Sequence, residues 1–247
     1  MPTLIEELHS YLFDGGPHVL AAPVEAWLAS SRRFVAFVSA GRDKIRKKLR
    51  VIKDEESLYD LKLELETVYL LLREKSLSVA YEPEHSRRFR SPDFAVTFTT
   101  SLTFMVEVTR LRAVQVSELS QTVSTGADRI AEAVCSKLGQ LLPQRSNILI
   151  VGMENPIPSQ SELQSAMLRL QQRAEGEETA FWQRYSFRDR TDFFASFHRL
   201  SEILVRGAQL DAQVPLAVWV NPQAKHHLPG KVRSAFYRSH SVEQAQD

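Results

Sequence analysis

Two acidic residues near the middle of the chain have the type and setting for metal-assisted chemistry. Asp93 follows Pro92 and precedes the apolar segment 94–98, and Glu107 lies inside the second apolar segment 104–110. A carboxylate within an apolar segment needs a partner, because burying an unpaired charge is costly. Two neighbouring carboxylates repel each other unless a cation lies between them, and their oxygens suit Mg²⁺ or Mn²⁺. Alternatively, Asp93 caps a turn and Glu107 pairs with an arginine.

Two strands are predicted to position these acids. Segments 94–98 and 104–110 are rich in β-branched and aromatic residues, and the polar residues 99–101 between them are typical of a turn. Side chains alternate along a strand, so Glu107 shares its face with Met105 and Thr109. Pairing of the two strands as a β-hairpin would bring Asp93 and Glu107 together at one edge of the sheet.

The surrounding segments alternate between helical and strand patterns. The apolar spacing predicts helices over 4–13, 24–39 (ended by Gly41), 57–75, 126–142, 160–174 and 191–207. Strands are predicted at 77–82, 147–153 and 216–220. The helix 126–142 separates two strands, which favours a parallel crossover connection between them.

Pro92-Asp93 followed by Glu107-Val108-Thr109 resembles the motif of the PD-(D/E)xK nuclease superfamily. The resemblance covers about residues 55–155 and the strand 216–220. It implies an α/β protein with a restriction-endonuclease-like core, in which helices flank a central mixed sheet of four to five strands. A single domain over 1–247 is expected, with a helical N-terminal extension at 1–54 and a helical insertion at 159–208 before the last strand.

The resemblance also implies roles for individual residues. Asp93 and Glu107 would be catalytic metal ligands, and the backbone carbonyl of Val108 would complete the ligand set. A glutamate on the first core helix reaches the active site in this superfamily, and Glu64 is the better match, with Glu66 second. Alternatively, Glu64 is a solvent-facing residue of an amphipathic helix.

The chain departs from the superfamily pattern at the motif lysine, where it carries Thr109. Lys137, at the edge of the apolar stripe of helix 126–142, is the best catalytic substitute, because lysines that have moved to this helix occur elsewhere in the superfamily. The Thr109 hydroxyl and Gln140 are auxiliary candidates. Alternatively, Lys137 extends into solvent, which would leave a site that binds metal poorly or is inactive.

Two basic segments are candidates for contact with nucleic-acid phosphates. One is the basic helical stretch 42–53, and the other is the loop directly before Asp93. Contacts to a phosphate backbone are electrostatic, and the arginine fork matches phosphate well. Ordinary solvated surface charges are the alternative for both segments. The candidates are Lys44, Lys47, Lys48, Arg87, Arg88 and Arg90.

These observations predict a divalent-metal-dependent nuclease that hydrolyses phosphodiester bonds, with DNA favoured over RNA as substrate. The rival hypothesis is an inactive nuclease-like module that binds nucleic acid or protein. The net charge of +1 gives no overall attraction to nucleic acid, so any attraction must be local. A single cysteine, Cys135, is compatible with a cytoplasmic location. No apolar run is long enough for a membrane span, so no membrane partner is expected. A homodimer is compatible with the hypothesis.

Overall fold

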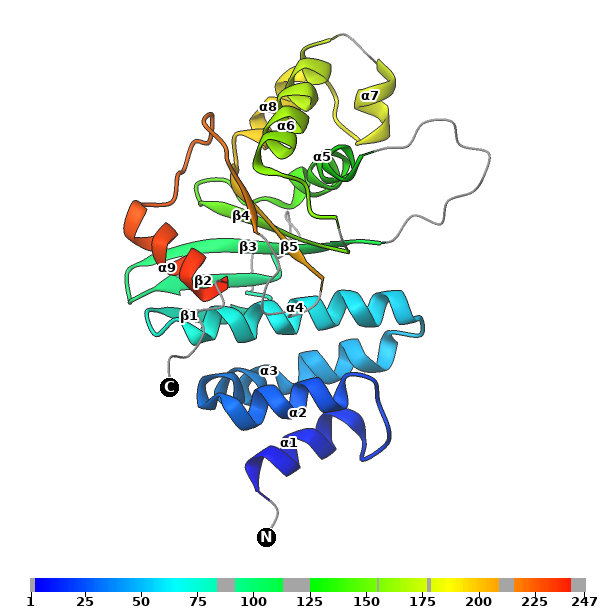
Figure 1. The fold of residues 1–247 in the computed structure, drawn as a ribbon, viewed down its shortest axis with the longest axis vertical. Coiled ribbons are helices and arrows are strands. Elements are labelled where there is room, and N and C mark those ends of the chain that lie inside the picture. The colour runs from blue at the N-terminus through cyan, green and yellow to red at the C-terminus, as the bar shows by residue number, and fades with distance from the viewer. Residues whose placement is uncertain are drawn as a thin grey trace. The chain divides into compact units, whose positions relative to one another are not determined.

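The computed structural model describes residues 3–83, 92–112, 125–154, 156–176, 179–208 and 216–240. It is an α/β structure in which helices flank a six-stranded mixed sheet of strand order β1-β2-β3-β4-β5-β6 (Figure 1). The expectation of four to five strands was therefore wrong. The chain divides into two compact units, one of residues 1–81, 96–102 and 230–247 and the other of residues 82–95 and 103–229. None of the helices within the described ranges is long and apolar enough to cross a membrane.

The first unit is mainly helical. It contains α1 (Leu4–Phe13), α2 (Ala21–Ser30), α3 (Arg32–Val51), α4 (Glu55–Arg73), β1 (Leu77–Tyr81) and α9 (Gly230–His240). Figure 1 shows α1 to α4 as successive layers. The single helix predicted over 24–39 is instead divided between α2 and α3. Ser31 separates them in an extended conformation, and its side chain caps α3 by accepting a hydrogen bond from the Phe34 N–H at 3.2 Å.

Gly41 does not end a helix, contrary to the sequence prediction, because α3 continues to Val51. Glycine inside a helix costs only about 1 kcal/mol relative to alanine. The buried stripe of α3 continues past it through Ile45 and Leu49. A β-carbon placed on Gly41 would lie 3.6 Å from the Tyr81 side chain. The packing of the amphipathic helix therefore outweighs the local preference of glycine for a break.

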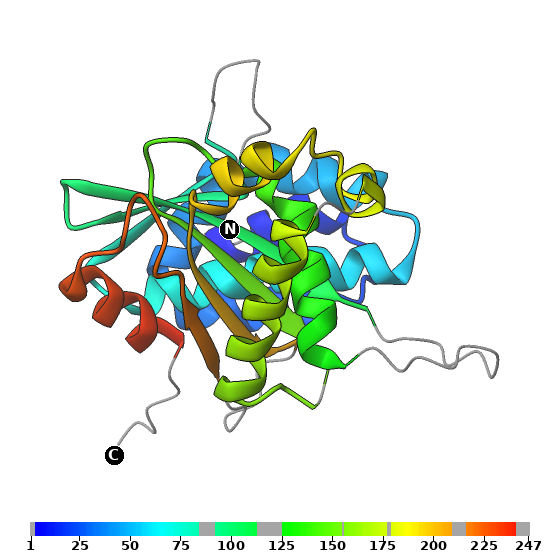
Figure 2. The same cartoon turned by 90° about the horizontal axis from the view of Figure 1, so that it is seen from above.

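The second unit is built on parallel strands. β3 (Leu102–Leu111, of which residues 103–111 belong to this unit) pairs in parallel with β4 (Asn147–Met153), and β4 pairs in parallel with β5 (Leu200–Gly207). The predicted parallel crossover through α5 (Gly126–Lys137) is thereby confirmed. α6 (Gln160–Glu175) lies beside α5 over β4 and β5 (Figure 2). A hydrophobic core forms between them, with Ile130, Leu149, Val151, Leu163, Met167 and Ile203 among its members.

The helix predicted over 191–207, and with it a wholly helical insertion at 159–208, was wrong. The chain forms α7 (Thr179–Arg184) and α8 (Arg190–Phe197), and then the strand β5. β5 is buried along its whole length, Glu202 and Arg206 included. The spacing of the few apolar residues in so short a segment does not distinguish a helix from a buried strand. Asn221, which is distant in sequence, bonds to the backbone where α8 ends and β5 begins. Its side chain donates to the carbonyls of Phe197 and Leu200 at 3.0 and 2.8 Å.

The last strand, β6 (Ala217–Val220), pairs antiparallel with β5 and stands at the end of the strand order. Unpaired backbone groups on such an edge invite pairing with another chain. Here the Gln160 side-chain amide bonds to the backbone N–H and C=O of Val218, as a neighbouring strand would. Its oxygen accepts from the Val218 N–H at 3.0 Å, and its nitrogen donates to the Val218 carbonyl. The first turn of α6 thus covers part of the sheet edge.

Asn147 joins three segments at the start of β4 and is 1% exposed. Its side-chain oxygen accepts from the Leu142 N–H at 3.0 Å. Its amide nitrogen donates to the carbonyls of Leu142, Arg145 and Arg199 at 2.9, 2.9 and 3.0 Å. The side chain therefore satisfies backbone groups that would otherwise be buried without partners.

We expect Asn147→Ala to lower the free energy of unfolding by about 3 kcal/mol, because each buried backbone group left unsatisfied costs roughly 1–3 kcal/mol. Urea unfolding followed by circular dichroism measures the change. Ser146→Ala is the matched control, since its exposed hydroxyl makes one 3.3 Å bond to the His227 carbonyl. Equal stabilities for the two variants would contradict this account.

Candidate active site

Asp93 lies directly before β2 (Phe94–Phe98), and the backbone holds it on two sides. The Glu82 N–H donates to the Asp93 carbonyl at 2.8 Å. The Asp93 side chain accepts from the Val108 N–H through Oδ2, also at 2.8 Å. Charge-assisted bonds of this length are among the stronger protein hydrogen bonds. The carboxylate of Asp93 is therefore fixed against the backbone of β3.

Glu107 lies in the middle of β3 with its side chain 5% exposed. Its register partner on β4 is Leu149, a member of the hydrophobic core under α5. Glu107 Oε2 accepts from the Asp93 N–H at 3.4 Å, a long contact, so the Asp93 backbone and the Glu107 carboxylate approach each other directly. The predicted convergence of these two acids is observed.

Lys137, the last residue of α5, reaches the same place. Its Nζ lies 2.7 Å from Glu107 Oε1, and its side chain is 23% exposed. The helical spacing of α5 buries Ile130 and Val134 and leaves Lys137 at the edge of that stripe. The alternative in which Lys137 extends freely into solvent is not what the structure contains.

The electrostatics of this group are those of a crowded acid pair. Burial raises the pKa of Glu107, and the negative charge of Asp93 raises it further, while Lys137 acts in the opposite direction without cancelling the shift. A carboxylate beside another carboxylate gains if positive charge is added between them. The second unit thus contains two acids whose repulsion one lysine only partly offsets.

The donor atoms fit a small oxygen-preferring cation. Mg²⁺ is commonly bound through one or two carboxylates and keeps several waters. The N–H and C=O of one strand residue point to the same side of the strand, so the Val108 carbonyl faces the side on which its N–H meets Asp93. Within the described ranges, no group of three or more His, Cys, Asp and Glu side chains could hold a metal ion. The candidate donor set is therefore Asp93, Glu107 and this carbonyl.

Glu64 lies on α4, in the first unit, and is not among the groups that the second unit brings together. Its Oε2 pairs with Lys48 Nζ at 2.8 Å, and the Tyr81 hydroxyl donates to the same oxygen at 3.4 Å. Burial lowers the pKa of Lys48, but its interactions with the Glu64 carboxylate and with Tyr81 outweigh burial and raise it overall. Glu66, the second choice, is buried on the same helix. A catalytic role for Glu64 stays a prediction.

The predicted phosphate-contacting residues are placed only in part. Lys44 and Lys47 are exposed on α3, where the Lys44 ammonium also donates to the Tyr81 carbonyl at 3.4 Å. Lys48 is engaged with Glu64 and does not present an open cation. Acids of the same unit also meet neighbouring bases of α3, since Asp14 pairs with Arg46 and Arg50. The remaining three candidates, Arg87, Arg88 and Arg90, lie outside the described residues.

The two auxiliary candidates lie close in sequence to Glu107 and Lys137, but their side chains make no hydrogen bond with the described part of the chain. Thr109 is half-buried on β3, on the strand face that carries Glu107. Gln140 ends the short 3₁₀ helix η1 (Leu138–Gln140) that follows α5 and is also half-buried. Their auxiliary roles stay predictions.

The sequence analysis missed the contact that best fixes the site, which is the Val108 N–H bonded to Asp93. The Pro92-Asp93 pair contains a usable signal for it. An aspartate at the start of a strand often accepts a hydrogen bond from a backbone N–H, and the predicted hairpin placed β3 alongside.

Comparison with family models, with curated proteins and with solved structures finds no match to this chain.

Glu107→Gln is expected to stabilise the metal-free protein at neutral pH. A carboxyl whose folded-state pKa is raised contributes stability below its unfolded pKa, near 4.3, and loses that contribution as the pH rises through the folded value. Removing the charge should therefore increase the free energy of unfolding at pH 7, by about 1.4 kcal/mol per unit of pKa shift. The gain should vanish near pH 4.

Urea unfolding in EDTA, at pH 4 and pH 7, measures this difference. Glu162→Gln is the opposite-sign control, because hydrogen bonds from Ser159 lower the pKa of Glu162. Its replacement should reduce stability at pH 7. A Glu107→Gln variant that is less stable than the wild type at pH 7 would mean that the ion pair with Lys137 outweighs burial.

Proposed function

We propose that the chain is a divalent-metal-dependent nuclease that hydrolyses phosphodiester bonds, with DNA as the favoured substrate. The observation that carries the proposal is the meeting of Asp93, Glu107 and Lys137 within the second unit. Lys137 Nζ lies 2.7 Å from Glu107, and Asp93 bonds to the backbone next to Glu107. Two acids and a lysine in contact are what the PD-(D/E)xK resemblance requires, although the lysine comes from a helix.

The carboxylates of Asp93 and Glu107, with the Val108 carbonyl, would hold a Mg²⁺ or Mn²⁺ ion. When bound, such an ion supplies an acidified water and neutralises phosphate oxygens. The chain itself keeps the donors in place without the ion, because the Val108 N–H anchors Asp93. Burial of Glu107 keeps this side of the site poor in water, which strengthens its electrostatic interactions.

Lys137 is proposed to act on the phosphate or on the attacking water. Its ammonium group is 2.7 Å from one Glu107 oxygen, and the long flexible stem allows a shift toward a bound phosphodiester. A positive charge aimed at the developing negative charge of the transition state typically contributes a factor of about 10²–10³ in rate. In this arrangement Lys137 takes the place of a lysine at position 109.

A binding module without turnover is the second candidate, and one observation favours it. The Lys137 ammonium group partly neutralises the acid pair in the absence of any cation. Thr109 on the strand offers a hydroxyl but no charge. A protein with these features could keep a nuclease-like surface for DNA and bind metal too weakly to cut.

Asp93→Ala and Glu107→Ala should abolish cleavage, and Lys137→Ala should slow it by about 10²–10³-fold. The assay incubates purified protein with plasmid, linear duplex DNA, single-stranded DNA and RNA in Mg²⁺ or Mn²⁺, and EDTA should stop it. Asp192→Asn and Lys225→Ala are the matched controls. Asp192, on α8, pairs with the exposed Arg188, and Lys225 is an exposed loop residue. Both controls should cut like the wild type.

Metal binding is measured separately from turnover, by the shift of the melting temperature on adding Mn²⁺. The wild type should be stabilised, and Asp93→Ala should lose that stabilisation. Cleavage that persists in both alanine variants would overturn the site. Binding of DNA without cleavage and without any metal-dependent shift would favour the binding module.

A further inference from the structure

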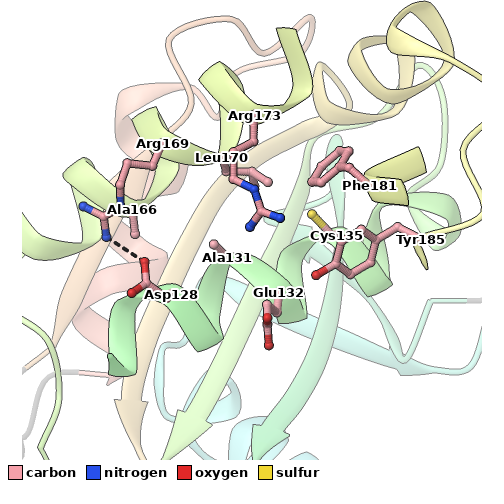
Figure 3. A pocket seen from close by; sticks show the side chains of 10 residues that line it. All are labelled: Asp128, Ala131, Glu132, Cys135, Ala166, Arg169, Leu170, Arg173, Phe181 and Tyr185. Carbon is pink, nitrogen blue, oxygen red and sulfur yellow. Dashed lines mark hydrogen bonds and ion pairs between the residues drawn. The ribbon is translucent and has the colours of Figure 1, made fainter. Parts of the chain in front are cut away.

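A cavity of about 400 Å³ lies among α5, α6 and α7 of the second unit (Figure 3). Its volume falls within the range of about 300–1,000 Å³ typical of small-molecule sites. Ala131, Ala166, Leu170 and Phe181 supply apolar surface. None of the residues of the proposed nuclease site lines it.

The basic residues around the cavity differ in how they are paired. Arg169 donates to Asp128 at 2.7 Å, and Arg184, beside the cavity, donates to Glu132 at 3.1 Å. The Arg173 side chain has no hydrogen bond or ion pair with the described part of the chain. Its guanidinium instead lies over the Phe181 ring, 5.5 Å from the ring centroid. Figure 3 shows this guanidinium group pointing into the space among the three helices.

Two further polar groups face the cavity, the Cys135 thiol and the Tyr185 phenol, and both are uncharged at neutral pH. Burial raises the pKa of the Cys135 thiol to about 12, against the opposing effect of Arg173, so the thiol stays protonated. Burial also raises the pKa of the Tyr185 phenol. Because Asp128 and Glu132 each have an arginine partner, Arg173 contributes the charge that a ligand would meet.

We propose that this cavity binds a small organic anion. A carboxylate or phosphate group contacts the Arg173 fork, and an apolar or aromatic part contacts Leu170, Ala131 and the Phe181 side. A guanidinium that lies on an aromatic ring keeps its N–H groups in its own plane, the geometry that binds carboxylate or phosphate through two parallel hydrogen bonds. The inference does not depend on the proposed nuclease activity.

Two features of the site select among anions. The apolar wall favours a ligand that carries a ring or alkyl group over inorganic phosphate, since burial of apolar surface adds to the charge contact. Among the described residues, Arg173 is the one guanidinium at the cavity without a carboxylate partner, which favours a ligand with one anionic group over one with several. An aromatic carboxylate and an aromatic phosphate monoester both satisfy these conditions.

Cys135 provides a site-specific readout, because it is the only cysteine in the chain and lines the cavity. The rate of its reaction with methyl methanethiosulfonate, a small neutral reagent, is measured by mass spectrometry at alkaline pH, where more of the thiol is in the reactive thiolate form than at neutral pH. The probes are benzoate, phenyl phosphate, inorganic phosphate and neutral benzyl alcohol. A bound ligand slows the reaction in proportion to occupancy, by about tenfold when its concentration is ten times the dissociation constant.

Benzoate or phenyl phosphate should slow the reaction of the wild type more than inorganic phosphate or benzyl alcohol does at equal concentration. The stronger of the two identifies the preferred anionic group. Arg173→Ala should lose this protection, while its melting temperature stays unchanged because Arg173 is exposed on α6. Arg188→Ala, whose side chain is 84% exposed, is the matched control and should keep the protection.

Unchanged reaction rates with all four probes at 10-millimolar concentrations (on the order of the weakest affinities that such sites show) would overturn the proposal. Protection that persists in Arg173→Ala would also overturn it, because the anion would then be bound elsewhere. Neither outcome bears on the nuclease hypothesis, which depends on Asp93, Glu107 and Lys137.

Discussion

The buried carboxylate of Glu107 is the constraint around which the second unit is arranged. With 5% of its side chain exposed, its charge is tolerable only if the fold brings partners to it. Two partners come from separate segments: the ammonium group of Lys137 and the backbone N–H of Asp93. An apolar residue at this position would spare the fold that requirement. Fold stability alone does not call for an acid at this position, whereas the proposed metal site would.

The parallel strands determine where these partners lie. β3 and β4 pair with Glu107 opposite Leu149, so Glu107 faces the core beneath α5. A shift of one residue in this register would turn Glu107 to the other face of the sheet. The last turn of α5 then falls near Glu107, and a lysine there can reach the carboxylate. Under the proposed function, Lys137 would supply from α5 the positive charge that the motif would place at position 109.

Local patterns predicted the elements of this site well, and long-range contacts account for most of what they missed. The apolar run 147–153 correctly predicted β4, because a parallel strand that is buried on both faces consists almost entirely of apolar residues. The pairing of Asp93 with Glu107 could be expected from hairpin geometry, and Lys137 from its place on the α5 stripe. The Val108 N–H bond to Asp93 depends on how a strand end meets its neighbour, which no periodicity encodes.

Fold errors had similar physical origins. Residues 200–207 fit a helical stripe and a buried strand equally well, and the choice is made by pairing with β4 and by Asn221, a residue distant in sequence. At Gly41 the prediction of a helix end followed from the low helix propensity of one glycine, but the amphipathic pattern of α3 continues through it to Val51. At Gly41 tertiary packing overrides a local preference worth about 1 kcal/mol. At 200–207 it decides between two patterns that fit equally well.

α5 contributes residues to both the proposed metal site and the cavity among α5, α6 and α7. One side of the helix carries Ile130 and Val134 into the core and ends at Lys137, which meets Glu107. Another side carries Ala131 and Cys135 to the cavity against α6 and α7. Because protein interiors are close-packed, a ligand that shifts α5 in the cavity must also move Lys137 unless the helix bends. Lys137 is the end residue of the helix, where the carbonyl ends concentrate negative potential that favours a cation.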